Sequence, residues 1–173
     1  YLSRGLGDVY KRQANNNKSV RVTPHQRRRG PQMKTQFLLW QKLKIVIDSV
    51  EAQIAKELQQ KHGLGITEYR ALSLLIEAPD SELRMQELAK CLGLNQSSVT
   101  RLVERLEKGG HTIRDLCPKD KRGVYTVLTG KGREAQTSAE KEYAEFLNNA
   151  LSEAALIEDN ADIVQSLREM IQL

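Results

Sequence analysis

The chain has 173 residues, of which 39% are hydrophobic and 28% are charged, and its formal net charge at pH 7 is +5. This length suits one domain with a core, and the composition favours a helical protein over a large buried sheet. No apolar run reaches the roughly 18 residues that a membrane helix needs, and no secretory signal pattern is present. Two cysteines provide no disulfide framework, so we expect a reducing, cytoplasmic location and no membrane association.

The charge is unevenly distributed along the sequence. Residues 84–133 contain eleven basic and five acidic side chains, a net charge of +6. Residues 134–173 contain two basic and nine acidic side chains, a net charge of −7. Clustered positive charge is typical of proteins that bind a polyanion, so the central segment is the candidate for a nucleic-acid site.

Residues 1–32 do not resemble a folded domain. The stretch ANNNKSVRVTPHQRRRGP has almost no large apolar residues and no periodicity. We therefore expect a disordered or artefactual tail, with Met33 as a plausible natural start. Arg27, Arg28 and Arg29 would alternatively form an arm that contacts nucleic acid, but a solvated tail is the simpler interpretation.

A long helix is predicted over residues 34–61. Its apolar residues recur at helical spacing: Leu39, Leu43, Val46, Ile47, Val50, Ile54 and Leu58. Phe37 and Trp40 widen this stripe, so the helix must pack against partners on more than one side. A second helix is predicted to begin with Thr67 as its cap and to stop at Pro79.

Two short helices are predicted next, over residues 85–92 and 95–108, joined only by a Gly-Leu turn. Ala89 is small enough to let two crossing helices approach, Gly93 permits a positive φ in the turn, and Val99 fills the angle between the helices. This spacing is typical of a helix-turn-helix, whose second helix enters the DNA major groove. Cys91, in the first of the two helices, is expected to be a small buried hydrophobic residue.

The second short helix begins with small polar side chains and continues with two arginines. Short side chains let the backbone approach a duplex, and arginines reach guanine or phosphate. The predicted DNA-binding residues of this helix are Asn95, Gln96, Ser97, Ser98, Thr100, Arg101 and Arg105. The alternative is that Asn95 only caps the helix and that the arginines are solvated.

A β-hairpin is predicted over residues 111–129, with Lys119, Lys121 and Arg122 at its tip. A basic hairpin directly after a recognition helix is a winged-helix arrangement, and the wing would lie along the backbone or in the minor groove. Two helices are predicted after Lys131, separated by a break at EDN. The predicted fold is therefore mainly α with a small β-hairpin wing.

The stretches LRMQELAKCLGLNQSSVTRLVERLEKGG and CPKDKRGVYTVLTGKGREA resemble the MarR family of bacterial transcriptional regulators. The resemblance implies a domain over residues 33–173 and an obligate homodimer. Residues 33–62 and 131–173 would form the dimerisation helices, and residues 64–130 the winged helix. Each subunit would read half of a pseudo-palindromic operator in double-stranded DNA, with Asp120 orienting Arg122. The family pattern departs at His111 and Thr112, where two apolar residues are usual, and at Ile113, where a basic residue is common.

Many members of this family release DNA when a small aromatic or lipophilic effector binds, and Phe37, Trp40 and Tyr69 are the candidates to line such a pocket. Ordinary core or dimer packing is the simpler explanation for these three side chains. The predicted function is thus a repressor released by a ligand. Two alternatives remain, namely a winged-helix protein-interaction module and a redox sensor that acts through Cys117.

Other chemistry is not indicated by the sequence. The three histidines have no metal-ligand spacing to cysteine or acidic residues, so we expect no metal and no cofactor. Phosphate-binding, dinucleotide, nucleophile-elbow and zinc-protease motifs are all absent, so the chain is not expected to be an enzyme.

Overall fold

The computed structural model describes the backbone of residues 31–116, 124–157 and 159–172. Contacts divide the chain into two units, residues 1–40 and residues 41–173. The helices are α1 (Pro31–His62), α2 (Ile66–Glu77), α3 (Met85–Leu92), α4 (Gln96–Lys108), α5 (Gly130–Ala155) and α6 (Ala161–Ile171). The strands are β1 (Glu82–Arg84), β2 (Thr112–Leu116) and β3 (Val124–Leu128), and a short 3-10 turn covers Pro79–Ser81.

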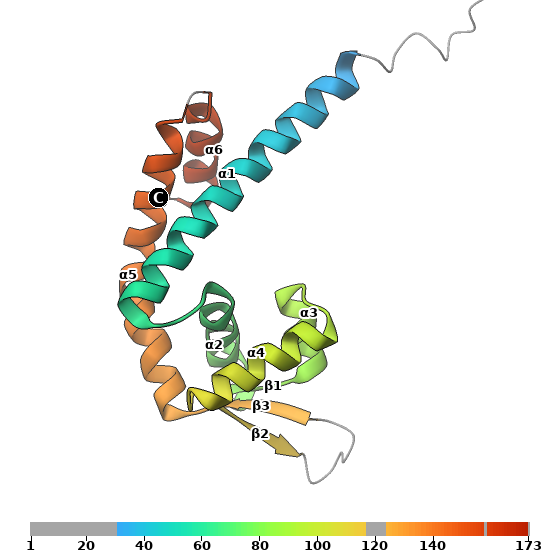
Figure 1. Ribbon diagram of the computed structural model, residues 1–173, viewed down its shortest axis with the longest axis vertical. Helices are drawn as coiled ribbons and strands as arrows, with labels where there is room; N and C mark the ends of the chain where they lie inside the picture. The colour runs from blue at the N-terminus through green and yellow to red at the C-terminus, as the bar shows by residue number, and fades with distance from the viewer. Residues whose placement is uncertain (1–30, 117–123, 158, 173) are drawn as a thin grey trace, which may run out of the picture. The chain divides into compact units, whose positions relative to one another are not determined.

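Helices α2, α3 and α4 pack against one another, and a three-stranded antiparallel sheet of order β1-β3-β2 lies beside them (Figure 1). Strands β2 and β3 form the hairpin that follows α4. The side chains between these helices are fully buried and apolar: Leu72, Leu75, Leu88, Val99, Leu102, Val103 and Leu106. Their burial positions the polar outer face of α4. The prediction of a mainly helical fold with a small hairpin wing is confirmed.

The turn between α3 and α4 has the predicted geometry. Gly93 adopts a left-handed conformation with φ 65° and ψ 27°, and the Leu94 N–H donates to the Ala89 carbonyl at 2.9 Å. A residue with a Cβ is strained in this conformation, whereas glycine is not. Ala89 and Val99 are both buried, as their spacing predicted.

The predicted start of α2 is wrong. Thr67 lies inside the first turn, and the residue before the helix is Gly65. The Gly65 N–H donates to Glu68 Oε2 at 3.0 Å, so a carboxylate from the first turn of the helix binds the backbone of the residue before it. The predicted stop is confirmed, because α2 ends at Glu77, shortly before Pro79.

Strand β1 was not predicted from the sequence. It has only three residues, and Leu83 pairs with Thr126 at the centre of its register with β3. Three residues are too few to show the alternation that identifies a strand. Because β1 pairs with β3, the wing hairpin is part of a three-stranded sheet. An isolated two-stranded hairpin would be only marginally stable.

Within residues 41–173, one face of α1 is buried through Val46, Val50, Ile54 and Leu58. These side chains belong to the same hydrophobic cluster as Phe146, Ala150 and Leu151 of α5 and Val164 of α6. The predicted apolar stripe of α1 is therefore confirmed at these four positions, whereas Ile47 of the same stripe is 39% exposed. Helix α1 begins at Pro31, a little before the residue expected from the sequence.

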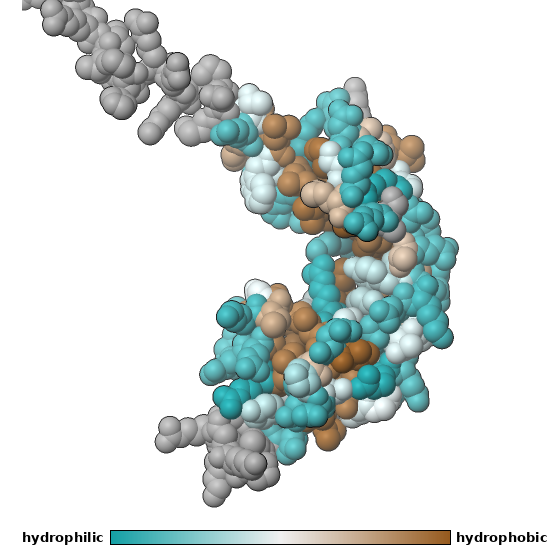
Figure 2. All heavy atoms as spheres, turned by 180° about the vertical axis from the view of Figure 1, so that it is seen from behind, coloured by the Kyte–Doolittle hydropathy of each residue, from teal (hydrophilic) through white to brown (hydrophobic). Residues whose placement is uncertain are grey.

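Large apolar side chains remain exposed on the long helices. In residues 41–173 they include Ile45 and Ile47 of α1, Leu156 and Ile157 after α5, and Met170 and Ile171 near the chain end. Figure 2 shows hydrophobic side chains at the surface around the α5–α6 connection. In the separate unit that ends at Trp40, residues 37–40 of α1 are each more than half exposed. Among the described residues, no helix has the length and apolar character that a bilayer crossing requires.

Candidate nucleic-acid interface

The first turn of α4 is organised by Asn95. Its Oδ1 atom accepts hydrogen bonds from the Ser98 N–H and from the Ser97 hydroxyl, both at 2.8 Å. The capping role considered for Asn95 is therefore real, and it satisfies one of the N–H groups that every helix start leaves free. A capped first turn holds the following polar side chains in a fixed orientation.

The remaining polar side chains of the turn are open to solvent or partly so. Gln96 and Ser97 are exposed, whereas Ser98 and Thr100 are half-buried. The Thr100 hydroxyl donates to the Gln96 carbonyl at 2.8 Å, which leaves its oxygen able to accept a further hydrogen bond. The turn thus presents short donors and acceptors on a surface that no described segment covers.

Ser97, Arg101 and Arg105 are spaced four residues apart and share one face of α4. That face lies opposite the buried stripe of Val99, Leu102 and Leu106. A helix with one apolar face and one polar, basic face matches what a groove-binding helix requires.

The two arginines on this face differ in their contacts. Within the described residues, the Arg101 side chain has no hydrogen bond and no ion pair. Arg105 Nε donates to Glu68 Oε1 at 2.9 Å, and its terminal nitrogen lies 3.4 Å from the Arg101 carbonyl oxygen. Glu68 is largely buried, with 18% of its side chain exposed, whereas 57% of the Arg105 side chain is exposed. Sequence reasoning missed Glu68, because it lies on another helix.

A third arginine, Arg114, lies on strand β2 of the wing. Its Nε atom is 3.2 Å from Glu107 Oε2, and a terminal nitrogen is 4.0 Å from Glu104 Oε1. Both glutamates belong to α4, so this ion pair joins the wing strand to the helix. Arg114 and its partners were not among the predicted site residues.

The base of the wing has a defined register despite its departures from the family pattern. Thr112 is buried opposite Leu128, and Ile113 is 56% exposed opposite Val127. Burial, and then the nearby Lys131 ammonium, lower the pKa of His111. The imidazole is therefore neutral at pH 7 and adds no positive charge to this surface.

The predicted residues of the wing tip, Lys119, Asp120, Lys121 and Arg122, lie outside the described residues. Cys117, the predicted redox-active thiol, also lies outside them.

The three predicted effector residues fall in different parts of the chain. Phe37 and Trp40 lie in the unit that ends at residue 40, with 60% and 63% of their surface exposed. Tyr69 is buried in the other unit, and its ring stacks on Tyr143 with 4.9 Å between centroids and 12° between planes. Burial raises the pKa of both tyrosines. Both phenols therefore stay neutral at pH 7.

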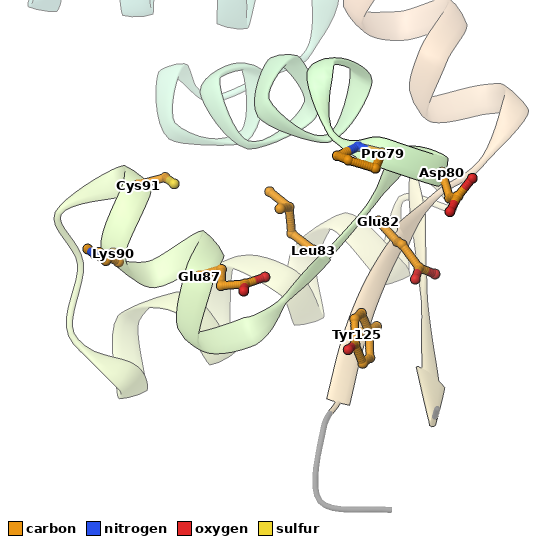
Figure 3. Close-up of a pocket in the computed structure, with 8 residues that line it drawn as sticks. All are labelled: Pro79, Asp80, Glu82, Leu83, Glu87, Lys90, Cys91 and Tyr125. Atoms are coloured by element: carbon orange, nitrogen blue, oxygen red, sulfur yellow. The ribbon is translucent and has the colours of Figure 1, made fainter. Parts of the chain in front are cut away.

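Cys91 is exposed, so the prediction that it is a buried hydrophobic residue is wrong. It lies near the end of α3, away from the buried face formed by Leu88 and Ala89. It lines an open hollow of about 700 Å³ that also contacts Leu83 and Tyr125. In Figure 3, Cys91 and Glu87 project from α3 on the side of Leu83.

The comparisons with known proteins agree with this arrangement. The model of the MarR family matches residues 62–123, from the end of α1 through the winged-helix region. This stretch of the chain is similar to the MarR family. The resemblance noted in the sequence is thereby confirmed.

Among curated relatives, YkoM of Bacillus subtilis, an uncharacterized HTH-type transcriptional regulator, is 39% identical over 75 residues. The match covers 43% of this chain and 47% of YkoM. The chain spans about half the length of the curated relatives it matches.

Solved structures share the fold over most of the chain, and one of them, Sco3205, is a MarR family transcriptional regulator. Sco3205 of Streptomyces coelicolor, solved in complex with DNA, has a TM-score of 0.65 and 28% identity, and the match covers 80% of this chain and 87% of Sco3205. CouR of Rhodococcus jostii, solved with p-coumaroyl-CoA, has a TM-score of 0.55 and 25% identity, with 75% of this chain and 86% of CouR covered.

Proposed function

We propose that this protein is a sequence-specific DNA-binding transcriptional regulator of the MarR family in which α4 is the recognition helix. The observation that carries the proposal is the outer face of α4. A capped first turn there presents short polar groups, and Arg101 extends from the same face without a partner among the described residues. Such groups read base edges and contact phosphates. The 28% identity to Sco3205, solved in complex with DNA, supports this reading.

The basic wing tip is proposed to contact the DNA backbone next to the groove that α4 enters. Asp120 would orient Arg122 there, and Lys119 and Lys121 would add positive charge. The pairing of Arg114 with Glu107 supports this role, because it holds strand β2 against the recognition helix.

We propose further that the functional form is a homodimer built from α1, α5 and α6. The exposed apolar side chains on these helices support a dimer, since a contiguous exposed apolar surface usually marks an interaction site. A two-fold dimer would present two copies of α4 to two half-sites of a pseudo-palindrome.

The dimer proposal predicts a mass twice that of the 19.6 kDa chain in light scattering at micromolar concentration. Met170→Glu places a charge on an apolar side chain that is 71% exposed, and it should shift the protein toward monomer. Gln86→Glu, at an exposed position on α3, is the matched control and should leave the mass unchanged. A monomeric wild-type protein, or equal behaviour of the two variants, would contradict the proposal.

The last part of the proposed function is control by a small effector. The DNA-bound protein would repress transcription, and the effector would release it from DNA. CouR was solved with p-coumaroyl-CoA, and YetL, 32% identical over 71 residues, is named a transcriptional repressor. Phe37, Trp40 and Tyr69 remain the side chains that the sequence predicts for effector binding. An effector should lower DNA affinity when it binds the DNA-free conformation more tightly than the DNA-bound one.

Selection from a random DNA pool tests the proposal directly. The full chain is incubated with the pool at near-physiological salt, and bound DNA is amplified and sequenced over several rounds. We expect an enriched inverted repeat whose half-sites lie about one helical turn apart. Weak binding that salt abolishes, without any enriched sequence, would favour the protein-interaction module and overturn the proposal.

A further inference from the structure

Resting on the proposed DNA-binding function, we propose that Glu68 is a positioning residue for the recognition helix. In this proposal Glu68 orients the Arg105 guanidinium so that its exposed edge meets a DNA phosphate. Glu68 acts through Arg105 and does not itself touch DNA.

The two carboxylate oxygens of Glu68 accept hydrogen bonds from donors on different elements. Oε2 accepts from the Gly65 N–H at 3.0 Å, at the start of α2. Oε1 accepts from Arg105 Nε at 2.9 Å, on α4. Each oxygen therefore has its own partner, and the side chain cannot rotate without losing one of the two bonds.

The first turn of α2 contacts three other helices, and these contacts fix the position of the Glu68 carboxylate. The ring of Tyr69 stacks on Tyr143 of α5. Arg70 forms an ion pair with Glu51 of α1 at 2.6 Å. Glu68 completes the set by reaching α4. Three consecutive residues thus tie α2 to three other helices.

Arg105 is bonded to Glu68 through Nε, the inner nitrogen of its guanidinium. One terminal nitrogen lies 3.4 Å from the Arg101 carbonyl oxygen, and no described residue bonds to the other. With 57% of the side chain exposed, the outer edge faces away from the protein. An arginine that is already ordered loses less side-chain entropy when it binds phosphate.

Glu68 also has an opposing effect, because its negative charge repels DNA. Its side chain is mostly buried behind Arg105, so a phosphate bound to the outer edge lies farther from the carboxylate than from the guanidinium. Charge repulsion over that longer distance is screened by salt, whereas the orientation of Arg105 acts at direct contact. We therefore expect positioning to outweigh repulsion.

The test compares Glu68→Gln with a matched charge control on the selected operator. The glutamine has one acceptor oxygen and an NH2 group, so it cannot accept from the Gly65 N–H and from Arg105 Nε through two separate oxygens, and it carries no charge to hold the guanidinium. Operator binding should weaken about 3- to 10-fold, the range expected when a flexible side chain must be ordered on binding because it is no longer held in place beforehand. Asp115→Asn removes the same charge from an exposed position on β2 that has no ion pair within the described residues, and it should not weaken binding.

A double-mutant cycle shows whether Glu68 acts through Arg105. In the Arg105→Ala background, Glu68→Gln should weaken operator binding no further. Arg105→Ala alone should reduce the slope of log K against log salt by about 1, as expected for one lost phosphate contact. An equal loss from Glu68→Gln in both backgrounds would overturn the proposal, as would tighter binding by Glu68→Gln than by wild type.

A measurement on the free protein separates this inference from the proposed function. The Nε–H resonance of Arg105, assigned by its disappearance in Arg105→Ala, should exchange with water more slowly than that of Arg101. Glu68→Gln should abolish the difference. If the wild type selects no operator, the proposed function fails and the inference fails with it. If the wild type selects an operator but exchange is equally fast at both arginines, only the inference fails.

Discussion

Arg101→Ala should weaken binding to the selected operator by roughly 1–3 kcal/mol while changing binding to random DNA much less. Arg101 shares the exposed face of α4 with Ser97, and no described residue competes for its guanidinium. A free guanidinium beside the capped first turn is suited to a bidentate contact with guanine. Competition titrations with operator and random duplexes at one salt concentration measure both affinities.

Lys108→Ala is the matched control for Arg101→Ala. It removes one positive charge from an exposed position near the other end of α4. Because that charge would act only through phosphates, binding to operator and to random DNA should fall by similar factors. If Arg101→Ala also lowers both affinities equally, Arg101 makes no sequence-specific contact with a base, and its role is restricted to the DNA phosphates.

Gly132→Ala should destabilise the folded protein by about 1–3 kcal/mol, the usual range for a side chain forced into a well-packed site. A Cβ built at Gly132 would lie 2.1 Å from the His111 carbonyl oxygen and 2.8 Å from Leu128 Cδ1. The backbone must shift to relieve this overlap. That shift would strain the bond from the Thr129 N–H to the same carbonyl, now 3.0 Å long, which joins the start of α5 to the base of the wing. Chemical denaturation at a fixed protein concentration measures the loss.

The control for Gly132→Ala lies two residues earlier on the same helix. A Cβ built at Gly130 meets no atom within 4 Å. Gly130→Ala should therefore change stability by less than about 1 kcal/mol, and toward stabilisation, because alanine has the higher helix propensity. A similar loss for both variants would mean that helix composition, and not the contact with His111, governs this junction.

Several features of the fold follow from local sequence and are confirmed by the structure. The spacing of apolar residues predicted α1, because a helix repeats its faces every three to four residues whatever packs against it. Gly93 and Asn95 predicted the turn and the cap between α3 and α4, because both act on neighbouring backbone only. The family resemblance depends on the same stretch.

Predictions from local sequence were wrong or missing where the structure of a segment depends on contacts outside that segment. Thr67 is a good cap by type, yet Glu68 satisfies the start of α2 from inside the helix. Strand β1 exists because β3 offers it a hydrogen-bonding edge. Cys91 was expected to be buried, but its position on α3 faces away from the helix interface.

For the proposed interface, the sequence by itself determined which side chains share the outer face of α4, since that depends on spacing alone. Only the tertiary structure decided that Arg101 has no described partner while Arg105 pairs with a glutamate 37 residues away. Arg114 likewise pairs with α4 only because β2 packs beside that helix. The physical reason is that ion pairs form across packed surfaces. The packing of whole helices and strands, and not the spacing of residues within one of them, sets which charges meet.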